Sequence, residues 1–263
     1  MSIGTLIGTI LGYAFWIIVL ALIGLWIFTK IFGTSASDNN IGQSKEESAN
    51  EKKESVEELA YGFLSEYLDV DPGELVQQAY AFIDKRDWPR AVACYQSAAT
   101  RGNADAQADL AYLYENGHGV PVNYEKAVMW YQKAAEQDHG AAQLALGKMY
   151  IEGKGVSQNN SLSFSWMIKA AEKGYADAQC AVGTMYYGGM GVEEDDHKAA
   201  EWYRRAAEQG NAPAQYHLGV MYGRGHGVEQ DFFESLKWLD LAAEQGHEEA
   251  RTLSNNVKSV VYK

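Results

Sequence analysis

The chain has 263 residues, 47% of them hydrophobic, and its 22 basic and 35 acidic residues leave a formal net charge of −13. The apolar fraction is enough for a folded core and excludes disorder throughout, while the negative charge would repel a nucleic-acid backbone, so nucleic acid is not an expected partner. The chain has two cysteines, Cys94 and Cys180, and their wide separation argues against a disulfide framework.

Residues 3–29 predict a transmembrane helix. The segment from Met1 to Thr29 carries no charged side chain and is almost wholly apolar apart from Gly and Thr. As a helix it would measure roughly 39 Å, which exceeds the ~30 Å hydrocarbon core of a bilayer. It is too long for the apolar region of a signal peptide, and no Lys or Arg precedes it. We therefore expect a permanent, single-pass anchor in a bacterial inner membrane.

The lysines around the anchor indicate its orientation. Lys30, Lys45, Lys52 and Lys53 all follow the apolar segment, and only the terminal amine precedes it. The positive-inside rule then places the C-terminal part of the chain in the cytoplasm. Lys30 alone lies close to the predicted span, so the periplasmic orientation stays open as the alternative.

Three glycines in the predicted span point to contact with a second helix. Gly4, Gly8 and Gly12 are spaced four residues apart, which puts them on one helix face. Such a face lets another helix approach closely, so self-association through the span is one interpretation. The other is that glycine is simply frequent in membrane helices.

Residues 34–55 predict a flexible polar linker. Ile41 is the one large aliphatic residue in this stretch, which otherwise consists of Ser, Asn, Gly and charged residues. Such a segment buries too little apolar surface to offset the entropy of ordering it. The folded part of the chain is therefore expected to be tethered to the membrane.

The sequence repeats itself with a period of 36 residues. Units at 103–138, 139–174, 175–210 and 211–246 share a tyrosine, a glutamine, a tryptophan, a Gly-x-Gly turn and a following valine. The tryptophans of the four units are Trp130, Trp166, Trp202 and Trp238. A fixed period of this length is the signature of a repeat architecture.

Each unit predicts two helices joined by the Gly-x-Gly turn. In the first unit, Ala104, Ala111 and Tyr114 recur at helical spacing before Gly117, and Tyr124 begins a second helical pattern. One helix pair cannot bury its own apolar face, so neighbouring pairs must stack. The predicted fold is all-α: the transmembrane helix, then an α/α superhelical solenoid. Residues 56–102 are expected to form a capping helix and a degenerate hairpin, and residues 247–263 a final capping helix.

The repeats resemble those of a known family. The segments AQLALGKMYIEGKGV and AEWYRRAAEQG are similar to the Sel-one-like repeat (SLR), a relative of the tetratricopeptide repeat. The pattern departs at Ser163, Met167, Ser235 and Leu239, where Ala and Tyr are usual; we interpret these as packing substitutions. The resemblance implies that the protein acts as an adaptor. Members of this family assemble membrane complexes, regulate signalling pathways, or mediate interactions with a host or a competitor.

No pattern in the sequence indicates catalysis or a cofactor. The six histidines lack the spacing of a metal motif, and no nucleophile elbow or zinc-protease motif occurs. The Gly-x-Gly turns follow helices rather than strands, so they are turns and not phosphate-binding loops. The tryptophans recur at helical spacing and are expected in the core. We predict that the protein is not an enzyme and has no cofactor or metal.

The first helix of each unit supplies a candidate protein-binding groove. If these helices line the inner wall of the solenoid, residues three and four apart face inward and form a stripe rich in tyrosine and aliphatic side chains. Such exposed apolar surface often marks a protein or peptide site. The alternative is that some of these side chains pack against the neighbouring unit. The candidate residues are Tyr112, Glu115, Leu144, Lys148, Ile151, Thr184, Tyr187, Tyr216 and Val220.

The resulting hypothesis is a membrane-anchored scaffold that binds a protein or peptide in this groove. One alternative is an immunity-type protein that neutralises a secreted toxin, and another is a regulator of an envelope or signalling complex.

Overall fold

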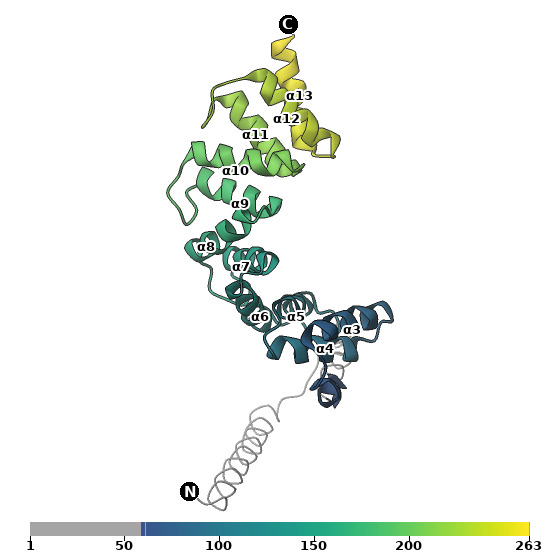
Figure 1. Ribbon diagram of the computed structural model, residues 1–263. Helices are drawn as coiled ribbons and strands as arrows, with labels where there is room; N and C mark the ends of the chain where they lie inside the picture. The colour runs from purple at the N-terminus through teal and green to yellow at the C-terminus, as the bar shows by residue number, and fades with distance from the viewer. Residues whose placement is uncertain (1–58, 61, 263) are drawn as a thin grey trace, which may run out of the picture. The chain divides into compact units, whose positions relative to one another are not determined.

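The computed structural model describes residues 59–60 and 62–262, and these form an all-α repeat structure (Figure 1). The predicted span with Gly4, Gly8 and Gly12, and the predicted linker, lie outside the described residues. Within the described part of the chain, no helix has both the length and the apolar character needed to cross a bilayer. The elements are η1 (Leu64–Tyr67), α3 (Pro72–Asp84), α4 (Trp88–Thr100), α5 (Ala104–Asn116), α6 (Tyr124–Glu136), α7 (Gly140–Glu152), α8 (Asn160–Glu172), α9 (Ala176–Tyr187), α10 (Asp196–Glu208), α11 (Ala212–Arg224), α12 (Phe232–Glu244) and α13 (Glu248–Val261).

Polar caps and left-handed glycines set the limits of the helices. The Asn123 side chain accepts a hydrogen bond from the backbone N–H of Lys126 at the start of α6, and Asp195 does the same for Lys198 in α10. Gly117 and Gly153 end α5 and α7 with φ of 68° and 67°, a conformation that glycine adopts without a steric penalty. The predicted Gly-x-Gly turn is thus the connection within each of these repeats.

The two helices of a repeat approach closely where the first carries a small residue. We call α5, α7, α9 and α11 the A helices, and α6, α8, α10 and α12 the B helices. A Cβ on Gly183 would lie 2.8 Å from the ring of Tyr203, and one on Gly219 would lie 2.7 Å from Leu239. The space freed by each glycine is therefore filled by a large side chain from the B helix.

The unusual serines of the second and fourth repeats are part of this packing. Ser163 is fully buried, and its hydroxyl donates a 2.7 Å hydrogen bond to the Gly147 carbonyl oxygen. Ser235 makes the same bond to Gly219. Met167 and Leu239, which stand where tyrosine is usual, are also buried. Both departures from the repeat pattern keep the A and B helices in contact.

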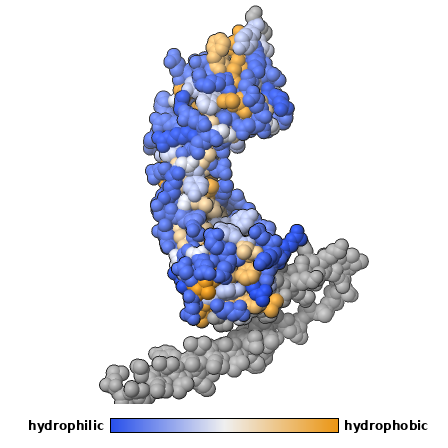
Figure 2. All heavy atoms as spheres, turned by 45° about the vertical axis from the view of Figure 1, so that its right-hand side comes forward, coloured by the Kyte–Doolittle hydropathy of each residue, from blue (hydrophilic) through white to orange (hydrophobic). Residues whose placement is uncertain are grey.

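The repeats follow one another as a single stack from α3 to α13, in which each helix packs against the next (Figure 1). The visible surface in Figure 2 is mostly polar, with small apolar patches. Trp130 and Trp238 are buried, as expected of core residues, but Trp166 and Trp202 are only half-buried. The amine of Lys169 lies 4.3 Å from the Trp166 ring centroid and the guanidinium of Arg205 4.4 Å from that of Trp202. Both rings still pack against the hydrophobic core clusters, so all four tryptophans contact the core, and these two are the more exposed members of the set.

A buried glutamine in each A helix connects that helix to the repeat before it. The Gln107 amide donates to the Ala99 carbonyl at 3.0 Å, and Gln143, Gln179 and Gln215 make the same bond eight residues back. In three repeats the amide oxygen accepts a bond from a second glutamine 30 residues later. These pairs are Gln137–Gln107, Gln209–Gln179 and Gln245–Gln215, at 2.7, 2.7 and 2.8 Å.

Candidate protein-binding groove

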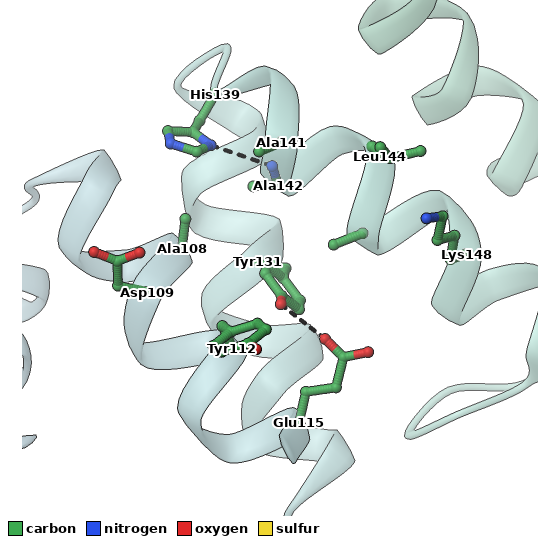
Figure 3. A pocket seen from close by; sticks show the side chains of 11 residues that line it. Ala108, Asp109, Tyr112, Glu115, Tyr131, His139, Ala141, Ala142, Leu144 and Lys148 are labelled. Carbon is green, nitrogen blue, oxygen red and sulfur yellow. Dashed lines mark hydrogen bonds between the residues drawn. The ribbon is translucent and has the colours of Figure 1, made fainter. Parts of the chain in front are cut away.

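The A helices of the first two repeats border an open hollow of about 350 Å³. Tyr112 and Glu115 of α5 lie on one side of it, and Leu144 and Lys148 of α7 on the other (Figure 3). The B-helix residue Tyr131 reaches the same hollow, where its hydroxyl donates a 2.8 Å hydrogen bond to the Glu115 carboxylate. Tyr112 is 52% exposed, so its ring is available to a partner.

Two further contacts fix the polar groups around the hollow. The Tyr80 hydroxyl of α3 donates to an Asp109 carboxylate oxygen at 2.8 Å. His139 caps α7 by accepting a hydrogen bond from the Ala142 N–H through Nδ1, and its Nε2 lies 3.3 Å from Asp105. The acidic groups of α5 are therefore held by residues of other helices rather than left to rotate.

Burial changes the proton affinities of these groups. Burial raises the pKa of the Asp109 carboxyl, opposed by hydrogen bonds from Tyr80 and Tyr95. Burial, with the adjacent Asp109, raises the pKa of Tyr80 to about 12. Burial also raises the pKa of Tyr131, and the Glu115 carboxylate adds to that effect. Both tyrosines therefore stay protonated near neutral pH and serve as hydrogen-bond donors to the carboxylates.

A second hollow lies toward the C-terminus. Tyr187, Tyr216 and Val220 line a cavity of about 180 Å³, together with His217 and Arg224. Tyr216 and Val220 also line an adjoining hollow of about 400 Å³ against α13. The His217 ring stacks on that of Tyr203 at 4.9 Å, and burial, reinforced by His247, lowers the pKa of His217.

The structure thus separates the nine predicted groove residues into three sets. Tyr112, Glu115, Leu144 and Lys148 line the first hollow, and Tyr187, Tyr216 and Val220 line the second. Ile151 packs against the core cluster around Met167. Thr184 accepts a 3.0 Å hydrogen bond from the Tyr203 hydroxyl. The last two residues line neither of these hollows, and their part in partner binding remains a prediction.

Tyr131, Asp109, His217 and Arg224 are groove residues that the sequence stripe did not include. Asp109 and His217 occupy the same position of their repeats, one residue beyond the stripe, so a wider stripe would have found them. Tyr131 belongs to a B helix and gives no such signal. Among the described residues, no three His, Cys, Asp or Glu side chains are placed to hold a metal ion together.

A sequence model of the Sel1 repeat, described as "Sel1 repeat", matches residues 84–103, 104–139, 140–175, 176–211 and 212–247. The four full-length matches each begin one residue after the unit boundaries derived from the 36-residue period. The first match is shorter and covers α4. No curated protein shows a significant match to this chain.

Two of the solved structures that match this chain show the same repeat fold, and a third is a weaker match. A Sel1 repeat protein from Oxalobacter formigenes is 31% identical, with 71% of this chain and 76% of that chain covered and a TM-score of 0.64. The protective antigen c5321 of uropathogenic Escherichia coli, which displays an SLR fold, is 28% identical with a TM-score of 0.69. That match covers 85% of this chain but 53% of the antigen, so the chain spans about half of the antigen's length. The immunity protein PA5088 of Pseudomonas aeruginosa is 26% identical, with 70% and 68% covered and a TM-score of 0.42.

Proposed function

Because the chain belongs to the Sel1 repeat family, we propose that it is a non-enzymatic scaffold that binds a segment of a partner protein along its A helices. The observation that carries this proposal is the hollow between α5 and α7, where the exposed Tyr112 ring stands beside two carboxylates held by tyrosines. Fixed polar groups around an exposed aromatic ring are the arrangement that a binding site needs for both affinity and orientation.

Charge indicates the kind of segment that fits the first hollow. Asp109 and Glu115 line it together with the single lysine Lys148, and the whole chain has a formal charge of −13. A partner segment with a basic side chain complements the carboxylates, and an adjacent apolar side chain covers Tyr112 and Leu144. Complementary charge of this kind favours both encounter and correct register.

Site-specific photocrosslinking tests this proposal. A photoreactive phenylalanine analogue replaces Tyr112 in the full chain, expressed in its own cells, and the crosslinked peptide is sequenced. The matched control places the same analogue at Met129, which is 43% exposed on the B helix α6. We expect one dominant peptide containing Lys or Arg from position 112, and none in common with position 129.

The charge dependence provides a second, independent readout. Glu115→Gln keeps the size of the side chain but removes its charge, and should weaken crosslinking from position 112 and make it less sensitive to salt. Identical crosslinks from positions 112 and 129, or an acidic peptide that binds Glu115→Gln equally well, would contradict the proposal. A secreted toxin as the crosslinked partner would instead support neutralisation as the biological role.

We also propose that residues 3–29 anchor the scaffold in the bacterial inner membrane, with the repeats in the cytoplasm. The support is the uncharged stretch from Met1 to Thr29 and the lysines that follow it. Fusion of green fluorescent protein after Lys263 should give a fluorescent, membrane-bound product that resists carbonate extraction. An active alkaline phosphatase fusion at the same position would show that the repeats lie in the periplasm instead. A product that carbonate extracts from the membrane would exclude the anchor.

A further inference from the structure

The first repeat carries a pair of groups that the other three repeats lack. Tyr112 and Glu115 are three residues apart in α5, which places them on one face of the helix. The residues at the same two positions of the later repeats are Lys148 and Ile151, Thr184 and Tyr187, and Val220 and Gly223. An aromatic ring followed one turn later by a carboxylate therefore occurs at these positions in one of the four repeats.

Neighbouring rings support the ring of Tyr112. The His118 ring, in the turn after α5, has its centroid 5.7 Å from that of Tyr112. His118 also stacks on Trp88, with centroids 6.0 Å apart and an interplanar angle of 15°. Trp88 packs against Gly119, where an added Cβ would lie 2.8 Å from the Trp88 Cβ. Tyr112 thus has packing partners although 52% of its surface is exposed.

The carboxylate of Glu115 is held in place and can still accept hydrogen bonds. The Tyr131 hydroxyl donates to its Oε2 at 2.8 Å. A carboxylate has two oxygens and about four acceptor sites, so this bond leaves capacity for further N–H donors. Glu115 is partly exposed and lines the same hollow as Tyr112 and Tyr131 (Figure 3). Its negative charge is therefore accessible to a cation that enters the hollow.

The ring and the carboxylate together distinguish the two basic side chains of proteins. A lysine ammonium is a compact, strongly hydrated charge, which can donate to Glu115 but has no flat face to place on Tyr112. An arginine guanidinium is planar and more weakly hydrated. It can stack on an aromatic ring while the N–H groups at its edge donate to a carboxylate. Arginine is therefore the side chain that uses both groups.

We propose that the hollow between α5 and α7 selects an arginine of the partner segment over a lysine. The guanidinium stacks on the exposed ring of Tyr112 and donates hydrogen bonds to the Glu115 carboxylate. Asp109 adds negative charge to the hollow, and Leu144 on α7 contacts an apolar side chain next to the arginine. This inference rests on the proposed scaffold function and adds the identity of the basic side chain, which charge alone does not determine.

Ligand-observed saturation-transfer NMR on the purified full chain tests this preference. The probes are N-acetyl-leucyl-arginine methylamide and its lysine and citrulline counterparts; citrulline keeps the planar group of arginine without its charge. We expect the lysine probe to bind about fivefold more weakly than the arginine probe, which is the size of one cation–π contact at an exposed site. The citrulline probe should bind about tenfold more weakly, because it lacks the charge-assisted hydrogen bond.

Three variants separate the ring from the charge. Tyr112→Leu removes the ring at an exposed position, so the arginine probe should bind about as weakly as the lysine probe. Glu115→Gln should weaken the binding of both cationic probes with little effect on the citrulline probe. Tyr124→Leu is the control, because Tyr124 is 36% exposed on the B helix α6 and does not line this hollow. It should retain the fivefold preference of the parent chain, a ratio set by the cation–π contact.

Equal binding of the arginine and lysine probes, or no saturation transfer to any probe, would overturn the inference. So would an arginine preference that survives Tyr112→Leu or is lost in Tyr124→Leu. None of these results would contradict the scaffold proposal, because a partner peptide that crosslinks from position 112 through a lysine-containing segment still supports it. The scaffold proposal fails separately, if positions 112 and 129 crosslink to the same peptides.

Discussion

Gly155 packs directly on the backbone of Tyr124, and a Cβ on Gly155 would lie 2.4 Å from the Tyr124 carbonyl carbon and oxygen. Tyr124 begins the B helix of the preceding repeat. Gly191 and Gly227 make the same approach to Asn160 and Asp196. The second glycine of each of these turns thus serves the contact between repeats as well as the turn itself.

Gly155→Ala should therefore lower the free energy of unfolding by about 2–4 kcal/mol, from the left-handed backbone strain and the clash together. Gly174→Ala is the control, since Gly174 has a φ of 93° but no atom within 4 Å of an added Cβ. Backbone strain alone should cost about 1–2 kcal/mol there. Urea unfolding measures both, and equal losses would show that the contact with Tyr124 is unimportant.

Gln215→Ala should reduce the free energy of unfolding by about 1–3 kcal/mol. The substitution leaves the buried Ala207 carbonyl and the Gln245 amide without their partner. Gln132→Ala removes a hydrogen bond on an exposed helix surface and should change stability little. Chemical unfolding of the two variants separates these cases; a loss for Gln132→Ala as large as that for Gln215→Ala would be the contrary outcome.

Trp238→Ala should be more damaging than Trp166→Ala, although the two residues occupy the same position of their repeats. Trp238 is 7% exposed, and truncation of a buried tryptophan costs about 3–5 kcal/mol. Trp166 is half-buried, so less apolar surface is lost and the cost should be smaller. Thermal and urea unfolding provide the comparison. Equal losses of stability in the two variants would show that the difference in exposure between Trp166 and Trp238 does not determine the cost of truncation.

Acidification should destabilise the C-terminal repeats through His217. Burial and His247 lower its pKa below the ordinary value of about 6.5, so the unfolded chain binds a proton at a higher pH than the folded chain does. The contribution of His217 to the free energy of unfolding should be largest above pH 6.5. It should decrease as the pH falls from 6.5 toward the pKa of His217 in the folded chain. Tyr203 and Tyr216, whose rings contact His217, offer no carboxylate to stabilise its charge.

The test is the pH dependence of urea unfolding between pH 5 and 8, a window around the ordinary histidine pKa. His217→Ala, which restores the residue found at Ala145 and Ala181, should reduce the slope. His226→Ala, in an exposed turn, is the control and should retain the slope. An unchanged slope in His217→Ala would show that other groups cause the acid sensitivity.

The sequence by itself determined the repeat and its helices. The 36-residue period, the Gly-x-Gly turns and the helical spacing of the apolar residues identified which helices pack together, because each contact is local to one repeat or its neighbour. The same reasoning predicted that Tyr112, Leu144 and Tyr216 lie on the inward-facing stripe of the A helices. In the structure these three residues line hollows.

Only the tertiary structure decided which residues at the same repeat position differ in burial and in hydrogen bonding. Trp166 and Trp238 share one repeat position but differ in burial, and Tyr131 reaches the groove from a B helix. The side-chain oxygen of Gln143 lacks the hydrogen bond that a second glutamine donates in the other three repeats, because Lys173 occupies that position and binds Asp138. The exposure and the hydrogen bonds of a residue depend on the side chains of the neighbouring repeat. The spacing of residues in the sequence predicts where those side chains are attached, but it does not predict their conformations.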